Sequence, residues 1–144
     1  MSNEIDAERI AGELHSIAIH LLRKVRREDE GSGLNAQRMS ALSVIVFGGP
    51  MTLGDLAAAE QVRPPTMSRI VNALEEQGLV VRSKDGEDGR STRLRATAAG
   101  RRLLKEGRGR RVRSLARGIE ALSGAEKSTL RAAARILADV VREI

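Results

Sequence analysis

The chain has 144 residues, of which 41% are hydrophobic and 31% charged, a composition that suits one soluble domain over 1–144. It has no cysteine, which excludes disulfides, thiolate metal sites and thiol redox sensing. No apolar run approaches the roughly 18 residues of a membrane span, and the polar first ten residues do not resemble a signal peptide. We therefore expect a cytoplasmic protein with no membrane partner.

The net charge of +6 is unevenly distributed along the chain. Residues 81–113 contain 12 Lys or Arg and 4 Asp or Glu, a net charge of +8, so the remainder is slightly acidic. Concentrated positive charge is typical of proteins that bind polyanions. A solvated basic helix face has the same composition, so charge alone leaves both interpretations open.

The first half of the chain predicts three helices. The first covers 3–27 and carries an apolar stripe at helical spacing, and the segment EDEGSG at 28–33 ends it. The second covers 34–47, with Asn35 as its N-cap. A short third helix over 53–60 begins after Thr52, which forms a capping pair with Asp55.

The stretch VRPPTMSRIVNALEEQGLVVRS at 62–83 predicts a fourth helix that starts at the prolines and ends near Gly78. Its apolar stripe consists of Met67, Ile70, Val71 and Leu74. Pro65, Arg69 and Asn72 lie on the opposite face, which Thr66 and Ser68 flank. By itself this is also the pattern of an ordinary amphipathic helix with a solvated side. Two short helices joined by a turn at 61–63 are typical of a helix-turn-helix.

A β-hairpin follows directly. Two β-like runs, 79–83 and 92–96, flank the pairs Asp85-Gly86 and Asp88-Gly89, which mark a hairpin tip. Arg93 and Arg95 alternate with Thr92, Leu94 and Ala96, which gives the hairpin a basic outer face. The predicted fold class is mainly α with a small β-hairpin wing, a winged helix-turn-helix over about 35–97.

Two more helices complete the chain. Thr97 caps the fifth, over 98–122, which Gly107 and Gly109 weaken in the middle, so that a bend or a loosened turn is expected there. Ser123 and Glu126 form a capping box for the sixth. The first and last helices have apolar stripes without a partner in the winged-helix core, and the simplest way to bury them is against each other and a second copy. We expect residues 3–30 and 98–144 to form a dimerisation region through Ile10, Leu14, Ile17, Leu21, Leu130, Leu137 and Val141.

The order of elements and two motifs resemble the MarR family of bacterial transcriptional regulators over residues 5–143. The motifs are TLGDLAAAEQVRPPTMSRIVNALEEQGLVVR at 52–82 and DGEDGRSTRLRATAAGRRLL at 85–104. The wing of the family reads Asp-x-Arg, then Leu and Thr, here Asp88, Arg90, Leu94 and Thr97. The resemblance implies a homodimer that binds a pseudo-palindromic operator in double-stranded DNA, with the fourth helix in the major groove and the wing in the minor groove. It further implies a repressor that a small-molecule effector releases from DNA.

The resemblance also assigns roles. Arg69 would reach a guanine with two hydrogen bonds, and Asn72 would read an adenine. The tip of the fourth helix would offer free N–H groups and a favourable dipole to phosphate. Arg90 would enter a narrow minor groove, oriented by Asp88, although a surface ion pair worth under about 1 kcal/mol is the alternative for these two. The predicted DNA-binding residues are Pro65, Thr66, Ser68, Arg69, Asn72, Lys84, Asp88, Arg90, Arg93, Arg95, Arg38 and Thr52.

Several alternatives remain open. The Arg-rich segment 101–113 is expected to pair with the acidic start of the first helix, Glu4, Asp6, Glu8 and Glu13, and the alternative is direct DNA contact. An effector cleft between the dimerisation helices and the winged lobe would have only Phe47 as an aromatic lining residue. The rival functions are a nonspecific, architectural DNA-binding protein and a winged-helix module that binds protein.

Catalytic and metal sites are not expected. His15 and His20 lie five residues apart, so a helix does not place them together as metal ligands. With only two histidines, the chain shows no pairing of a nucleophile with a general base. The sequence therefore predicts no enzyme, no cofactor and no metal.

Overall fold

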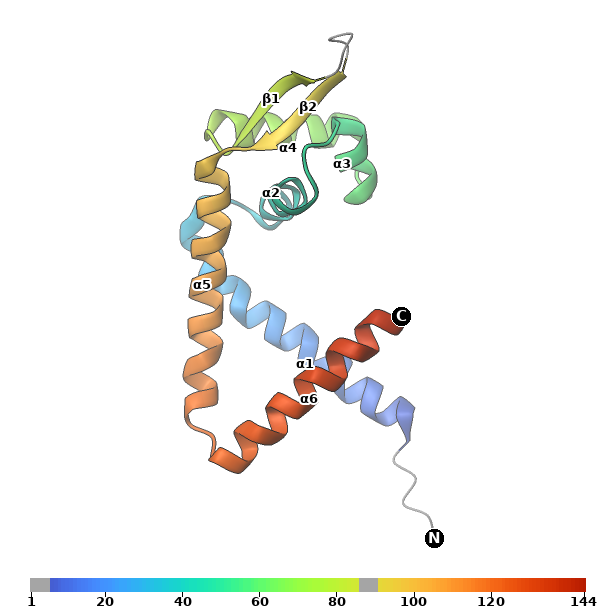
Figure 1. Cartoon of the computed structure of the whole chain (residues 1–144), viewed down its shortest axis with the longest axis vertical. Helices are drawn as coiled ribbons and strands as arrows, with labels where there is room; N and C mark the ends of the chain where they lie inside the picture. The colour runs from blue at the N-terminus through green and yellow to red at the C-terminus, as the bar shows by residue number, and fades with distance from the viewer. Residues whose placement is uncertain (1–5, 86–90) are drawn as a thin grey trace.

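The computed structural model describes residues 6–85 and 91–144, where helices and one antiparallel hairpin follow each other as the sequence predicted (Figure 1). The elements are α1 (Ala7–Arg26), the 3-10 helix η1 (Arg27–Ser32), α2 (Ala36–Gly48), α3 (Leu53–Ala59), α4 (Pro64–Glu76), β1 (Val80–Asp85), β2 (Ser91–Ala96), α5 (Ala98–Glu120) and α6 (Gly124–Glu143). The hairpin lies against α4, and α5 leads from its base to α6. The predicted winged helix-turn-helix fold class is confirmed.

Local capping determines where the helices begin. The Asn35 side chain accepts a hydrogen bond from the Arg38 amide at 2.9 Å, and Thr97 accepts one from the Gly100 amide at 3.1 Å. Capping boxes open α3 at Thr52 and α6 at Ser123. At α6, backbone and side-chain hydrogen bonds with Ser123 hold the pKa of the Glu126 carboxyl below its ordinary value. All four caps were predicted from the sequence.

An aliphatic core fills the winged lobe. Its fully buried side chains come from α2, α3, α4 and β2: Leu42, Ile45, Leu56, Met67, Val71, Leu74 and Leu94. Leu94 also exchanges two backbone hydrogen bonds with Met51, at 3.3 and 2.7 Å, which ties the hairpin to the segment before α3. The core thereby holds α4 and the hairpin in a fixed relation to one another.

The hairpin register decides which side chains face the lobe. Arg82 lies opposite Leu94, and residues directly opposite in an antiparallel pair share a face. Since Leu94 is buried, Arg82 also lies on the inner face of the hairpin. Arg93 and Arg95 occupy the outer face, as the alternation predicted. The predicted hairpin tip lies outside the described residues.

One of the two predicted interruptions is present. The α-helix ends at Arg26, close to the predicted boundary, and the segment after it forms the 3-10 helix η1, which ends at Gly33 with φ of +78°. The predicted bend in α5 is wrong, because the helix runs without interruption from Ala98 to Glu120. Gly107 is buried, and a Cβ there would lie 3.3 Å from Arg111 Nη1 and 3.5 Å from Asp29 Oδ1. Gly107 therefore lies at the contact between α5 and η1, within an uninterrupted helix.

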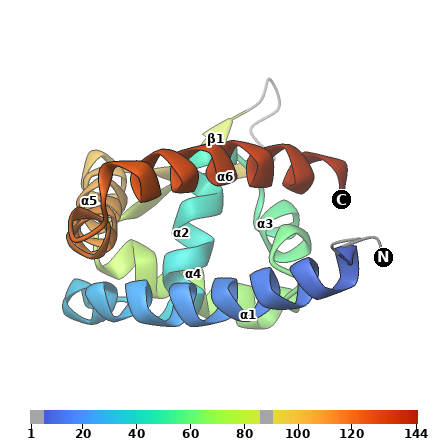
Figure 2. The ribbon, with the colours of Figure 1, turned by 90° about the horizontal axis from the view of Figure 1, so that it is seen from below.

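Within the single chain, the helices α1 and α6 do not bury their stripes against each other, and their burial in a homodimer stays a prediction. They cross in Figure 1, but Figure 2 shows them on opposite sides of the molecule. Neither helix has a buried residue, and Ile17 and Val141 are 59% and 67% exposed.

We expect Gly100→Ala to lower the free energy of unfolding by about 1–3 kcal/mol, because a Cβ at this position overpacks the junction between α5 and β1. The Cβ would lie 2.3 Å from the Leu79 carbonyl oxygen and 3.2 Å from Leu42 Cδ1. That carbonyl accepts a hydrogen bond from the Thr97 amide at 3.0 Å, so it is not free to move. Urea unfolding followed by circular dichroism, at one fixed protein concentration, measures the loss.

Gly118→Ala is the matched control in the same helix. A Cβ at Gly118 meets nothing within 4 Å, so this variant gains about 0.5–1 kcal/mol from helix propensity. If both alanine variants shift the urea midpoint in the same direction, the packing explanation for Gly100 is wrong.

Candidate nucleic-acid interface

A tight turn joins α3 to α4. The Val62 amide donates to the Ala57 carbonyl at 2.9 Å, and Gln61 adopts a positive φ of 53°, a conformation uncommon for a residue with a side chain. These contacts, together with the buried side chains of both helices, fix the angle at which α4 leaves α3. The turn therefore presents α4 as a rigid element.

The two faces of α4 are as the sequence predicted. Met67, Ile70, Val71 and Leu74 are buried in the core. Pro65, Thr66 and Arg69 are exposed, and Ser68 is half-buried beside them. Arg69 forms no ion pair or hydrogen bond with any described part of the chain, so its guanidinium is available to a ligand.

The tip of α4 differs from the expectation of several free N–H donors. Arg63 is the N-cap without a side-chain cap, and Pro64 and Pro65 occupy the first two helical positions. Proline has no N–H, so two of the four donors that a helix start normally leaves unpaired are missing. The first N–H inside the helix is therefore that of Thr66. The next one, on Met67, already donates to the Arg63 carbonyl at 3.0 Å, so the Thr66 amide is the donor that remains for a ligand. The double proline therefore makes the entry stiff but weakens phosphate binding by the tip.

Asn72, a predicted base reader, is engaged within the chain. Its Oδ1 accepts a hydrogen bond from Arg82 Nη2 at 2.8 Å, and Arg82 Nε donates to Glu75 Oε1 at 2.6 Å. Sequence reasoning missed Arg82. The alternation Val80, Arg82, Lys84 along β1 was a signal that could have placed Arg82 on the inner face.

The wing residues lie on both faces of the hairpin. Lys84 is exposed on β1, and Arg93 is half-buried on β2. Arg95 is exposed and donates through Nε to Ser83 Oγ at 3.1 Å, so its guanidinium is oriented by the neighbouring strand. Asp88 and Arg90, the predicted minor-groove pair, lie outside the described residues.

The structure gives Arg38 and Thr52 local positions at helix starts. Arg38 is half-buried in the first turn of α2. The Thr52 hydroxyl oxygen accepts from the Asp55 amide at 3.1 Å, and the Asp55 carboxylate accepts from the Thr52 amide at 3.3 Å. The Thr52 side chain therefore acts as the N-cap of α3.

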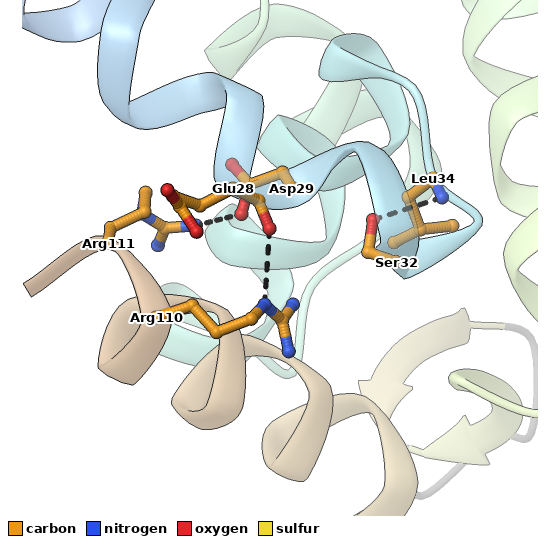
Figure 3. A network of polar contacts seen from close by, with 6 residues as sticks. All are labelled: Glu28, Asp29, Ser32, Leu34, Arg110 and Arg111. Atoms are coloured by element: carbon orange, nitrogen blue, oxygen red, sulfur yellow. Dashed lines mark hydrogen bonds and ion pairs between the residues drawn. The ribbon is translucent and has the colours of Figure 1, made fainter. Parts of the chain in front are cut away.

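The basic residues of α5 pair with acidic residues, but not with those that the sequence suggested. Arg111 Nη1 contacts Asp29 Oδ1 at 2.6 Å, and Arg110 Nε donates to the Glu28 carbonyl at 3.2 Å (Figure 3). Both partners lie in η1, because α5 packs beside η1 and not beside the start of α1. Among the predicted partners, Asp6 accepts from the Glu8 amide, Glu13 pairs with Arg9, and Glu4 is not described.

A cleft of about 480 Å³ lies beside this network, between α1, η1, α2 and α5. Arg26, Asp29, Glu30 and Arg111 are its charged lining residues. Leu22, Leu34, Met39 and Leu104 supply its apolar surface. Phe47 does not line it, contrary to expectation, because this side chain is 83% exposed near the end of α2.

Residues 6–85 and 91–144 contain no cluster of three His, Cys, Asp or Glu side chains able to hold a metal ion. No helix in the same part of the chain is long and apolar enough to cross a bilayer.

The packed helix-turn-helix, the adjoining basic hairpin and the exposed Arg69 define a winged helix-turn-helix protein. Residues 32–91 match the model of the MarR family. The chain is 33% identical over 135 residues to an HTH-type transcriptional regulator of Mycobacterium tuberculosis, which covers 94% of both chains.

Solved structures agree with this match. A MarR family protein from Bacillus stearothermophilus has a TM-score of 0.77 at 25% identity and covers 99% of both chains. A mutant of Staphylococcus aureus MepR, solved bound to an oligodeoxyribonucleotide, has a TM-score of 0.72 at 19% identity, over 92% of this chain and 97% of that one. The chain belongs to the MarR family of DNA-binding helix-turn-helix transcriptional regulators, a family of regulators and not of enzymes.

Proposed function

We propose that the protein is a cytoplasmic, sequence-specific regulator that binds a pseudo-palindromic operator as a homodimer, with α4 in the major groove and the wing in the adjacent minor groove. The observation that carries this proposal is the exposed Arg69, which has no partner among the described residues and lies on a helix whose opposite face is buried in the core. A guanidinium held on a rigid helix can donate two hydrogen bonds to guanine. Thr66 and Ser68 beside it are small enough for close approach, and Lys84, Arg93 and Arg95 supply phosphate contacts.

The exposed apolar stripes of α1 and α6 support the homodimer. Exposed large apolar side chains cluster on these two helices, whereas the core of the winged lobe is already closed. Extended apolar surface of this kind marks an interaction site. A second copy with two-fold symmetry would cover both stripes and place two α4 helices on one face of DNA.

The cleft beside η1 supports control by a small-molecule effector. It combines apolar lining with Arg26 and Arg111, the second of which joins α5 to η1 through Asp29. A ligand that competes for this pair would alter the junction between the dimerisation helices and the DNA-binding lobe. Release of DNA on effector binding would make the protein a repressor.

The test is selection of duplexes from a random-sequence library, followed by fluorescence-anisotropy titration of selected and scrambled duplexes at several salt concentrations. We expect selected sites to show a dyad with half-sites about 10 bp apart. Their affinity should exceed that of scrambled DNA by about a thousandfold or more. Equal binding to both duplexes with a steep salt dependence would instead identify an architectural DNA-binding protein. No binding to either would favour a module that binds protein.

A further inference from the structure

We propose that Arg82 is a positioning residue that sets the base preference of α4 by fixing the side-chain amide of Asn72. The inference rests on the proposed function, because it concerns how α4 reads DNA. In this arrangement Oδ1 of Asn72 is turned toward Arg82, and Nδ2 is the free end of the amide among the described residues. The amide therefore favours guanine, which offers two acceptors in the major groove, over adenine, whose N7 acceptor lies beside the N6 donor.

The Arg82 guanidinium joins two residues that are one turn apart on α4. Arg82 Nη2 donates to Asn72 Oδ1 at 2.8 Å, while Nε donates to Glu75 Oε1 at 2.6 Å. Asn72 and Glu75 are three residues apart, so they are neighbours on the helix surface. Arg82 lies opposite the buried Leu94, on the hairpin face that packs toward α4. The strand thus holds the fork of the guanidinium in place.

The bond to Oδ1 changes what Asn72 offers to DNA. An asparagine that reads adenine uses its oxygen to accept from N6 and its nitrogen to donate to N7. Here Oδ1 already accepts from Arg82, which fixes the direction of the amide and hinders the two-bond contact with adenine, while Nδ2 has no partner in the described parts of the chain. Guanine shows two acceptors, N7 and O6, side by side in the major groove. A fixed amide donor matches that edge.

The Glu75 contact has a second effect on the same surface. A carboxylate beside the groove-facing residues of α4 would repel the phosphates, and Arg82 neutralises it at 2.6 Å. The Arg82 and Glu75 side chains are 34% and 32% exposed, so solvent screens the pair and it adds little to the stability of the fold. Orientation of Asn72 is the larger consequence.

Two variants test the positioning role without changing the net charge of the protein. Arg82→Met combined with Glu75→Gln removes both members of the Arg82–Glu75 ion pair, and with them one positive and one negative charge. We expect this double variant to lose about tenfold discrimination between guanine and adenine at one operator position. Asn72→Ala should lose discrimination at the same position. Added to Asn72→Ala, the double change should cause no further loss there, because the residue that it positions is already gone.

The measurement is anisotropy titration against the selected operator and its single-base variants, with melting curves to show that each variant is folded. Arg9→Met with Glu13→Gln is the matched control, since it removes an exposed Arg–Glu pair on α1 and should leave the base preferences unchanged.

Three outcomes separate the hypotheses. If the double variant keeps every base preference of the wild-type protein, Arg82 does not position Asn72. A uniform loss over all operator variants with a shallower salt dependence also overturns the proposal, since it makes Arg82 a phosphate contact. Absence of any base preference in the wild-type protein rejects the proposed function instead.

Discussion

Ile17→Lys is expected to convert the homodimer into a monomer and to lower affinity for an operator with two half-sites by about a hundredfold or more. Ile17 lies in the middle of the α1 stripe and is 59% exposed in the single chain. A lysine there would place a charge in an apolar interface that must exclude water, where an unpaired charge is costly. Once the dimer dissociates, each α4 binds its half-site alone, and the gain from linking the two binding events is lost.

Sedimentation or light scattering measures the mass directly, against the 15.6 kDa of one chain. Ser16→Lys is the matched control, because Ser16 is the adjacent exposed residue outside the stripe. It adds the same charge but should leave both mass and operator affinity unchanged. A wild-type mass of one chain, or an Ile17→Lys protein that remains dimeric, would contradict the assignment of α1 to the dimer interface.

Arg69→Ala is expected to weaken operator binding by about 1–3 kcal/mol and to relax base preference at one position in each half-site. The side chain is exposed and unpaired within the described residues, so its loss leaves the fold intact. The two hydrogen bonds from arginine fit the O6 and N7 acceptors of guanine, and alanine has no donor to replace them. Titration of the operator and its single-base variants measures the loss of affinity and the position that relaxes.

Arg131→Ala provides the comparison for charge. It removes one exposed arginine from α6, which lies away from the winged lobe. This change should alter operator affinity only slightly. If Arg69→Ala weakens all base variants equally, the guanidinium binds phosphate and does not read a base.

The secondary structure could be predicted from sequence because short-range interactions decide it. Asn35, Thr97 and Ser123 cap helices through residues three positions ahead, and the stripe of α4 follows from helical spacing alone. The hairpin and its basic outer face follow from alternation and turn residues. The family resemblance rested on the same local motifs, and it identified Arg69 and Thr66 on the face of α4 that proves to be exposed.

The tertiary structure decided how residues far apart in sequence meet. Arg82 reaches Asn72 only because the register of the hairpin turns it toward α4, and Arg111 meets Asp29 only because α5 passes beside η1. The cleft beside η1 and the separation of α1 from α6 depend on how helices are arranged in space. Periodicity specifies which face of a helix is apolar, but it does not specify what covers that face.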